Sequence, residues 1–291
     1  MSEARSRGRS PLAIALFSLF WAGLALACAR YDLAISRALV DNTAGWARFG
    51  ERCGELPGVY AFALSAALCY ARPERTDARS LLGAELPWVI CCAGLSIVIA
   101  LSAYRLFDYR FDATAGTVCL LLVAALTRVA RRRLGAGIVL PVRVDRTCTW
   151  TVRLAVWSWL LVSTLKLGWG RIRYRDLAPL GQDFTPWYAP QGWTGHASFP
   201  SGHAASSWLL LPCLLLWPRA SARYRLAFVA SFSWGAFVCA SRVVIGAHYT
   251  SDVLFSTAFA FGVMAYALDL EQRKSPQRER EPIDPPSRVG I

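Results

Sequence analysis

The sequence predicts an all-α protein, a polytopic bundle of transmembrane helices, from three observations. The 291 residues are 55% hydrophobic and only 18% charged, which is too apolar for an ordinary soluble domain. The apolar residues gather in long runs without charge, of the length that a membrane-spanning helix needs. Basic residues concentrate in alternate loops between these runs, as the positive-inside rule requires.

Eight apolar runs follow one another along the chain. The first and third are long enough to cross a bilayer, whereas several others are short and could be buried core helices. We expect eight spans, with six as the alternative if two runs lie in the interface. The runs cover roughly residues 12–29, 56–71, 86–104, 113–127, 149–168, 204–218, 226–241 and 253–268.

The two ends differ from the membrane part, which we place at residues 11–270 with a motif core at 150–270. Residues 1–10 predict a short basic cytoplasmic tail, and residues 271–291, charged and rich in proline, predict a disordered cytoplasmic tail. The basic start and first apolar run also resemble a signal peptide, but the run is long for one, so an uncleaved anchor is favoured.

The loop charges predict the orientation. With a cytoplasmic N-terminus and eight spans, the inside segments hold 21 of the 32 Lys and Arg residues. A net charge of +13 in such a chain points to anionic membrane lipids as partners, and no motif indicates nucleic acid. The nine cysteines show no metal-ligand spacing.

Three segments with chemistry-bearing side chains fall at the predicted outer ends of helices. A phosphate ester needs several donors around its oxygens, and arginine offers paired ones. Serine and glycine before a helix favour an N-cap and close approach of an anion. A histidine can attack phosphorus or protonate a leaving oxygen, and a carboxylate can orient it. The segments hold Lys166 and Arg173; Ser201, Gly202 and His203; and Arg242, His248 and Asp252.

Other polar residues have simpler interpretations. The long loop 169–203 is rich in Trp and Tyr, which favour the membrane interface. His196 in this loop is expected to be an interfacial histidine or a minor substrate contact, and Asp176 and Asp183 are expected to support the loop.

Together the three segments resemble the signature of the type 2 phosphatidic acid phosphatase superfamily, in its membrane lipid phosphatase branch. The patterns are Lys-x6-Arg at 166–173, Pro-Ser-Gly-His at 200–203 and Ser-Arg-x5-His-x3-Asp at 241–252. Tyr174 departs from the proline that usually follows the first arginine.

The resemblance implies roles for these residues. His248 would be the nucleophile that forms a phosphohistidine, His203 the general acid, and Asp252 the residue that orients His248. The phosphoryl oxygens would be held by Lys166, Arg173, Ser201, Gly202 and Arg242. The resemblance implies no metal or other cofactor.

We therefore expect a bacterial inner-membrane phosphatase that hydrolyses a lipid phosphate or pyrophosphate monoester at the face towards the periplasm or exterior. The motifs fit a lipid phosphotransferase equally well. A protein of another class, a transporter or non-catalytic lipid binder, is the remaining alternative, because charges within membranes also mark transport paths.

Overall fold

The computed structural model describes residues 11–73, 81–135 and 137–278, and within them all regular structure is helical. This confirms the predicted all-α class. The α-helices are α1 (Pro11–Leu39), α2 (Gly45–Cys53), α3 (Leu56–Tyr70), α4 (Leu81–Phe107), α5 (Ala113–Leu134), α6 (Val142–Trp169), α7 (Gly202–Ser207), α8 (Ala222–Val244) and α9 (Thr250–Arg278). Three 3-10 helices complete the order: η1 (Tyr174–Asp176), η2 (Pro179–Gly181) and η3 (Trp208–Leu216).

Each of the eight predicted apolar runs lies in a helix, the sixth one in α7 and η3 together. In the described part of the chain, five helical segments are long and apolar enough to cross a membrane: Ala15–Leu39, Glu85–Phe107, Ala113–Leu134, Ala222–Val244 and Thr250–Arg273. These segments agree with a polytopic membrane protein. The number of crossings, eight or six, stays a prediction.

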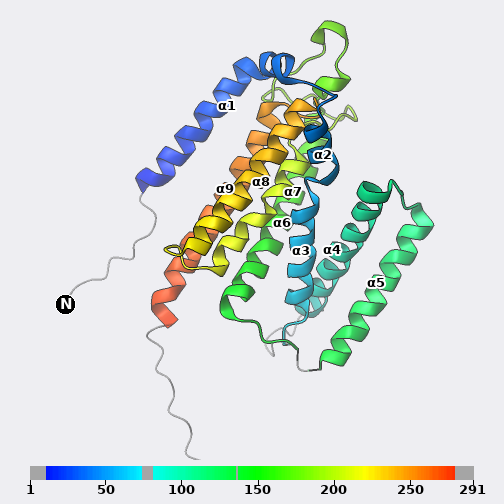
Figure 1. The fold of residues 1–291 in the computed structure, drawn as a ribbon, viewed down its shortest axis with the longest axis vertical. Coiled ribbons are helices and arrows are strands. Elements are labelled where there is room, and N and C mark those ends of the chain that lie inside the picture. Colours follow the sequence, from blue (N-terminus) through cyan, green and yellow to red (C-terminus); the bar gives the residue numbers. More distant parts are fainter. Residues whose placement is uncertain (1–10, 74–80, 136, 279–291) are drawn as a thin grey trace, which may run out of the picture.

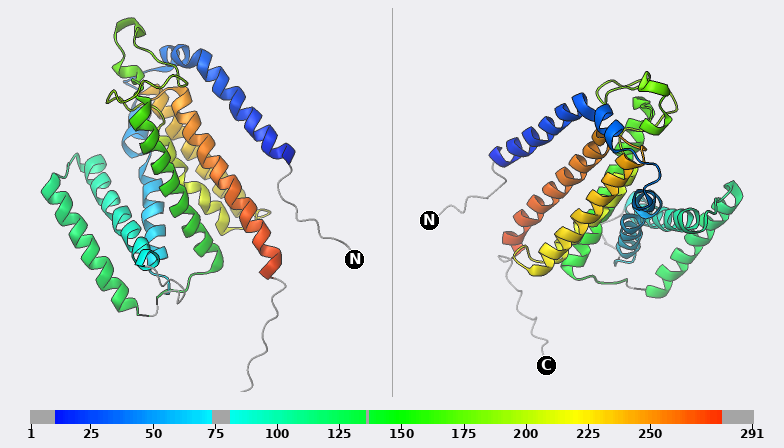
Figure 2. Two further views of the ribbon diagram at one scale, coloured as in Figure 1. Left: turned by 180° about the vertical axis from the view of Figure 1, so that it is seen from behind. Right: turned by 45° about the horizontal axis from the view of Figure 1, so that its top comes forward.

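The centre of the bundle is formed by α3, α6, η3 and α9. Its core contains the fully buried side chains of Phe62, Trp150, Leu154 and Leu209. Helix α4 packs on α3, and α5 packs on α4 at the outside of the molecule (Figure 1). Helix α1 lies beside α9 on the opposite side, as the two views of Figure 2 show.

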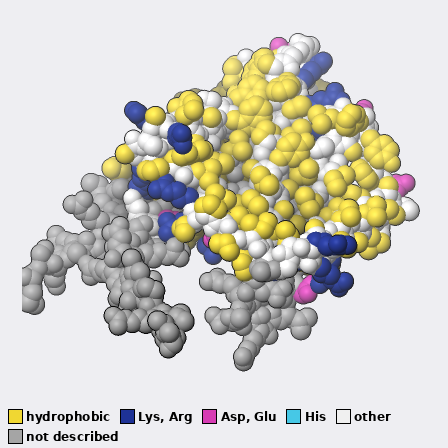
Figure 3. All heavy atoms as spheres, turned by 60° about the horizontal axis from the view of Figure 1, so that its bottom comes forward, with side chains coloured by type: hydrophobic (Ala, Val, Ile, Leu, Met, Phe, Trp, Pro, Cys, Tyr) yellow, Lys and Arg dark blue, Asp and Glu magenta, His cyan; other side chains and the backbone are white. Residues whose placement is uncertain are grey.

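Apolar side chains cover much of the face that Figure 3 shows. On α5, for example, Leu121 is 63% exposed and Leu126 is 66% exposed. Exposed apolar area of this extent would be unfavourable in water but is suited to lipid chains. The surface therefore agrees with an integral membrane protein.

The stretch 31–55, which lies between the first two predicted apolar runs, is largely helical. Helix α1 continues to Leu39, and α2 packs closely against α8. A Cβ atom added to Gly50 would lie 2.4 Å from Oγ of Ser241, so only glycine permits this approach. Helix α2 thereby lies next to the C-terminal end of α8, where Arg242 is.

The C-terminal boundary also differs from the sequence expectation, because α9 continues to Arg278 and residues 271–278 are helical. Glu271 explains the extension, since it pairs with Arg146 at 2.8 Å and accepts from the indole of Trp150. Arg273 also pairs with Asp269 one turn earlier at 2.9 Å. The predicted tail 1–10 and residues 279–291 lie outside the described part of the chain.

Candidate active site

The three predicted segments meet at one end of the bundle. The first and second segments are close neighbours, since a Cβ atom added to Gly202 would lie 3.9 Å from Nζ of Lys166. The second and third meet where the backbone N–H of Ser201 donates to the carbonyl of Asp252 at 3.1 Å. Helix geometry explains the meeting, since α6 ends, α7 begins and the α8–α9 turn lies at this same end (Figure 1).

His248 lies in the short turn between α8 and α9 and is only 3% exposed. Its Nδ1 atom is 3.4 Å from Oδ2 of Asp252, one helical turn later. The ring therefore directs Nδ1 to the carboxylate and leaves Nε2 for another partner. Burial lowers the pKa of His248 to about 4, although Asp252 opposes the shift. The imidazole is consequently neutral at pH 7, the state that a nucleophile needs.

Asp252 is completely buried and held by several donors. Its Oδ2 accepts from the hydroxyl of Ser198 at 2.5 Å and from the backbone N–H of Tyr249 at 2.9 Å. Its Oδ1 accepts from Nη1 of Arg171 at 2.6 Å. These bonds fix the carboxylate beside His248 and keep it ionised.

Arg171 connects this carboxylate to the N-terminal helix. Its Nη2 lies 3.0 Å from Oδ2 of Asp32 on α1, and its guanidinium stacks on the ring of Tyr249 at 4.0 Å. Ser251 also bonds to Asp32 through its N–H and its hydroxyl. None of the three sequence motifs includes Asp32. The one feature of the sequence that could have indicated it is a carboxylate next to the first apolar run.

Arg242, at the end of α8, is 3% exposed. Its Nη2 contacts Oε1 of Glu51 at 3.2 Å, and the same oxygen accepts from Nη1 of Arg175 at 2.9 Å. Nε and Nη1 of Arg242 are buried without a hydrogen-bond partner. Burial by itself would raise the pKa of Glu51, but the two guanidinium groups outweigh it and that pKa lies below its usual value. Arg242 thus holds one anionic group and has donors left for another.

His203, in the first turn of α7, is surrounded by groups from other helices. Its Nε2 lies 3.0 Å from Nη2 of Arg105, 3.2 Å from the carbonyl of Glu51 and 3.5 Å from Oε1 of Glu55. Arg105 can only donate, so it pairs with Nε2 when that nitrogen carries no proton. The two oxygens accept from Nε2 when it carries one. Glu55 and Arg105 also pair with each other at 2.6 Å. Sequence reasoning did not find either residue.

The remaining predicted phosphate-binding residues lie around the same point. Ser201 caps α7 as predicted, because its Oγ accepts from the N–H of Ala204 at 3.3 Å. Lys166 is half-buried, and Arg173 and Arg242 are near enough for their charges to act on it. Nε of Arg173 is buried without a partner. The site therefore gathers positive charge with donors that the protein itself leaves unused.

Of the residues given a simpler interpretation, His196 and Asp183 lie apart from this arrangement, whereas Oδ2 of Asp176 lies 4.0 Å from Nη1 of Arg173. His196 is exposed in the loop, and Asp183 accepts from the N–H of Ala178, which supports the loop turn. Tyr174, in the place of the usual proline, begins η1 and packs edge-on against Tyr249. In the described ranges no group of three or more His, Cys, Asp and Glu side chains could hold a metal ion.

The fold and this end of the bundle define an integral membrane protein with a cluster of basic side chains and two histidines, one of them paired with a carboxylate. Comparison with known families agrees. Residues 150–275, less than half of the chain, match the model of the PAP2 superfamily. This stretch contains all three motif segments.

Curated relatives match about a third of the chain. Phosphatidylglycerophosphatase B of Escherichia coli K12 is 39% identical over 93 residues, which is 30% of this chain and 35% of the relative. Lipid A 1-phosphatase of Rhizobium etli is 39% identical over 109 residues, which is 36% of this chain and 41% of the relative. The chain therefore spans well under half the length of these relatives. No solved structure is significantly similar to the chain.

Proposed function

We propose that this protein is an integral membrane phosphatase that hydrolyses a lipid phosphate or pyrophosphate monoester. The observation that carries the proposal is the neutral, buried His248 beside Asp252. Arg242 with its unpaired donors and His203 complete the arrangement. The curated relatives, named as phosphatases of two different lipids, favour a lipid substrate.

The proposed reaction is a double displacement. The lone pair of His248 Nε2 forms a bond to phosphorus while the bond from phosphorus to the lipid oxygen breaks, and His203 gives its proton to that oxygen. Asp252 stabilises the positive charge on His248. Water then attacks the phosphohistidine, its proton passes to His203, and the P–N bond breaks to release inorganic phosphate.

The cations would hold the phosphoryl oxygens during both steps. Nε and Nη1 of Arg242 and Nε of Arg173 are buried donors that a phosphoryl group would satisfy. Lys166 and the capped start of α7, with Ser201 and Gly202, would bind the other oxygens. The reaction as proposed uses no metal.

The location is part of the proposal. All three segments lie at the end of the bundle where the loop charges place the outside, so the site would face the periplasm or exterior of a bacterial inner membrane. Lipid head groups would reach it from the membrane surface.

The test is phosphate release by the purified protein from phosphatidate, phosphatidylglycerol phosphate, an isoprenoid diphosphate and lipid A, with a chelator present. We expect release of stoichiometric phosphate, its loss in His248→Ala and retention in His196→Ala, which changes a histidine outside the site. Retained lipid binding by the inactive variant would separate chemistry from binding. Hydrolysis by His248→Ala would refute the mechanism, and activity lost with chelator would refute the metal-free reaction. Phosphate passed to a second lipid would identify a phosphotransferase.

A further inference from the structure

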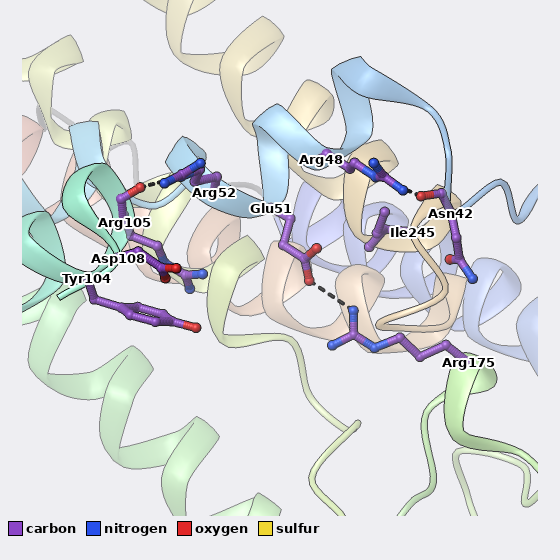
Figure 4. A pocket seen from close by; sticks show the side chains of 9 residues that line it. All are labelled: Asn42, Arg48, Glu51, Arg52, Tyr104, Arg105, Asp108, Arg175 and Ile245. Carbon is purple, nitrogen blue, oxygen red and sulfur yellow. Dashed lines mark hydrogen bonds and ion pairs between the residues drawn. The ribbon is translucent and has the colours of Figure 1, made fainter. Parts of the chain in front are cut away.

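A cavity of about 570 Å³ opens beside the site, and it is lined by arginines that belong to none of the three motifs. The lining comes from α2 and the segment before it, the end of α4 and the segments that follow α6 and α8. Figure 4 shows Glu51 between two groups of these residues. The lining residues are Asn42, Arg48, Glu51, Arg52, Tyr104, Arg105, Asp108, Arg175 and Ile245.

The cavity is continuous with the phosphate-binding residues. Oε1 of Glu51 bridges Arg175 in the cavity wall and Arg242 in the predicted active site, at 2.9 and 3.2 Å. Arg105 in the wall also contacts Nε2 of His203 at 3.0 Å. A group bound in the cavity would therefore lie next to a phosphoryl group held by Arg242.

The charge of the wall favours an anion. Four guanidinium groups face two carboxylates, those of Glu51 and Asp108. Arg48 donates to the carbonyl of Asn42 at 2.8 Å and Arg52 to the carbonyl of Arg105. Among the described residues neither Arg48 nor Arg52 forms an ion pair with a carboxylate. Both charges are thus available to a ligand.

The distribution of basic residues along the chain supports the same conclusion. Loops on the side opposite the cytoplasm normally hold few arginines. Of the eleven Lys and Arg residues at the predicted outer end, four line this cavity. Three others are the predicted phosphate-binding cations Lys166, Arg173 and Arg242. A basic cluster that runs against the topological preference indicates a binding role.

We propose that this cavity binds a second phosphate group of the lipid substrate while the first is held by Arg242. The inference rests on the proposed lipid phosphatase function and narrows its substrate class to lipids that carry two phosphate groups. The second phosphate can be linked directly, as in a diphosphate, or separated by a glycerol unit. When that phosphate binds, the ion pair between Glu51 and Arg175 must break, or Arg175 must contact both anions.

The test compares phosphatidate with diacylglycerol pyrophosphate of the same acyl chains, which differ only by one phosphate group. Phosphatidylglycerol phosphate, with a glycerol between its phosphates, is the third substrate. We expect the wild-type kcat/KM to favour the two-phosphate lipids. The double variant Arg48→Gln, Arg52→Gln should lower the ratio of two-phosphate to one-phosphate kcat/KM by about tenfold, since two charge-assisted contacts are lost at an exposed site.

A matched control is the double variant Arg219→Gln, Arg223→Gln. These two arginines have the same spacing of four residues, are exposed and lie at the opposite end of α8 from Arg242. The control should keep the wild-type ratio. A ratio unchanged in the Arg48, Arg52 variant for both two-phosphate lipids would overturn the proposal. A lower ratio for only one of the two-phosphate lipids would support the proposal and identify the distance between phosphates that the cavity accepts.

A binding measurement separates this proposal from the proposed function. Methylenediphosphonate, which is not hydrolysed, should bind the wild-type protein more tightly than inorganic phosphate, and the Arg48, Arg52 variant should lose this preference. If no lipid is hydrolysed by the wild type, the phosphatase function fails while this measurement still decides the cavity. Equal binding of both anions to the wild type would refute the cavity proposal even if hydrolysis is found.

Discussion

The buried ion-pair network of Arg171 gives the sharpest prediction. The variant Arg171→Met keeps the side-chain length and removes the charge that joins Asp32 to Asp252. Arg171 and Asp32 are each 1% exposed and Asp252 is 0% exposed, so water does not screen them. The substitution leaves two buried carboxylates without their shared cation.

The magnitude follows from the distances of 3.0 and 2.6 Å. With an effective dielectric constant of about 20, each pair contributes roughly 5–6 kcal/mol of Coulomb attraction. Desolvation of the charges offsets much of this, and removal of one partner from such a buried network costs about 3–5 kcal/mol. We expect the free energy of unfolding of Arg171→Met to fall by that amount. Phosphate release should fall with it, because Asp252 loses one of its donors.

The assay is equilibrium unfolding by titration of SDS into mixed micelles, with phosphate release measured on the same preparations. The double variant Arg171→Met, Asp32→Asn is the control, since it removes one of the two unpaired carboxylates and should recover part of the lost stability. A loss below about 1 kcal/mol in Arg171→Met would refute the reasoning. So would a double variant less stable than the single one.

Four further predictions concern the site and its neighbours. Because burial lowers the pKa of His248 to about 4, the acid limb of the kcat/KM profile, which reports the free enzyme, should lie near pH 4 and not near 6.5, and a pH–rate series checks this. The lowered pKa also affects stability, because between about pH 6.5 and pH 4 this histidine is protonated in the unfolded chain but not in the folded one. The free energy of unfolding should therefore fall as the pH falls through this range, and His248→Gln should reduce that fall. Glu51→Gln should tighten inhibition by inorganic phosphate about fivefold, since phosphate no longer competes with a carboxylate for Arg242; weaker inhibition would show that Glu51 supports binding. Gly50→Ala should lower stability by about 1–3 kcal/mol, because its Cβ would lie 2.4 Å from Ser241 Oγ, and unchanged SDS unfolding would contradict this contact.

The sequence predicted much of the helical framework because apolar runs of sufficient length have few other structures in a membrane. All eight runs lie in helices. It could not predict α2, because a short helix with charged residues has no apolar run, and its position depends on close approach at Gly50. The extension of α9 depends on pairs with Arg146 and Trp150, which are distant in sequence.

The site was predictable where residues follow one another at fixed spacing. His248 and Asp252 are separated by one turn, so local geometry brings them together. Asp32, Glu51 and Arg105 reach the site from α1, α2 and α4, more than ninety residues before the motif that they contact. A sequence motif of neighbouring residues cannot predict such contacts, because they depend on how the helices pack in the folded protein.

The bond between Asp32 and Arg171 also orders the assembly of the protein. Asp32 is synthesised with the first helix, whereas its partners lie 139 and 219 residues later in the chain. A buried carboxylate without a partner is unfavourable, so α1 gains little by docking before those partners exist. The structure therefore predicts that the first helix to enter the membrane is among the last to find its native place, after the turn into α9 has been inserted.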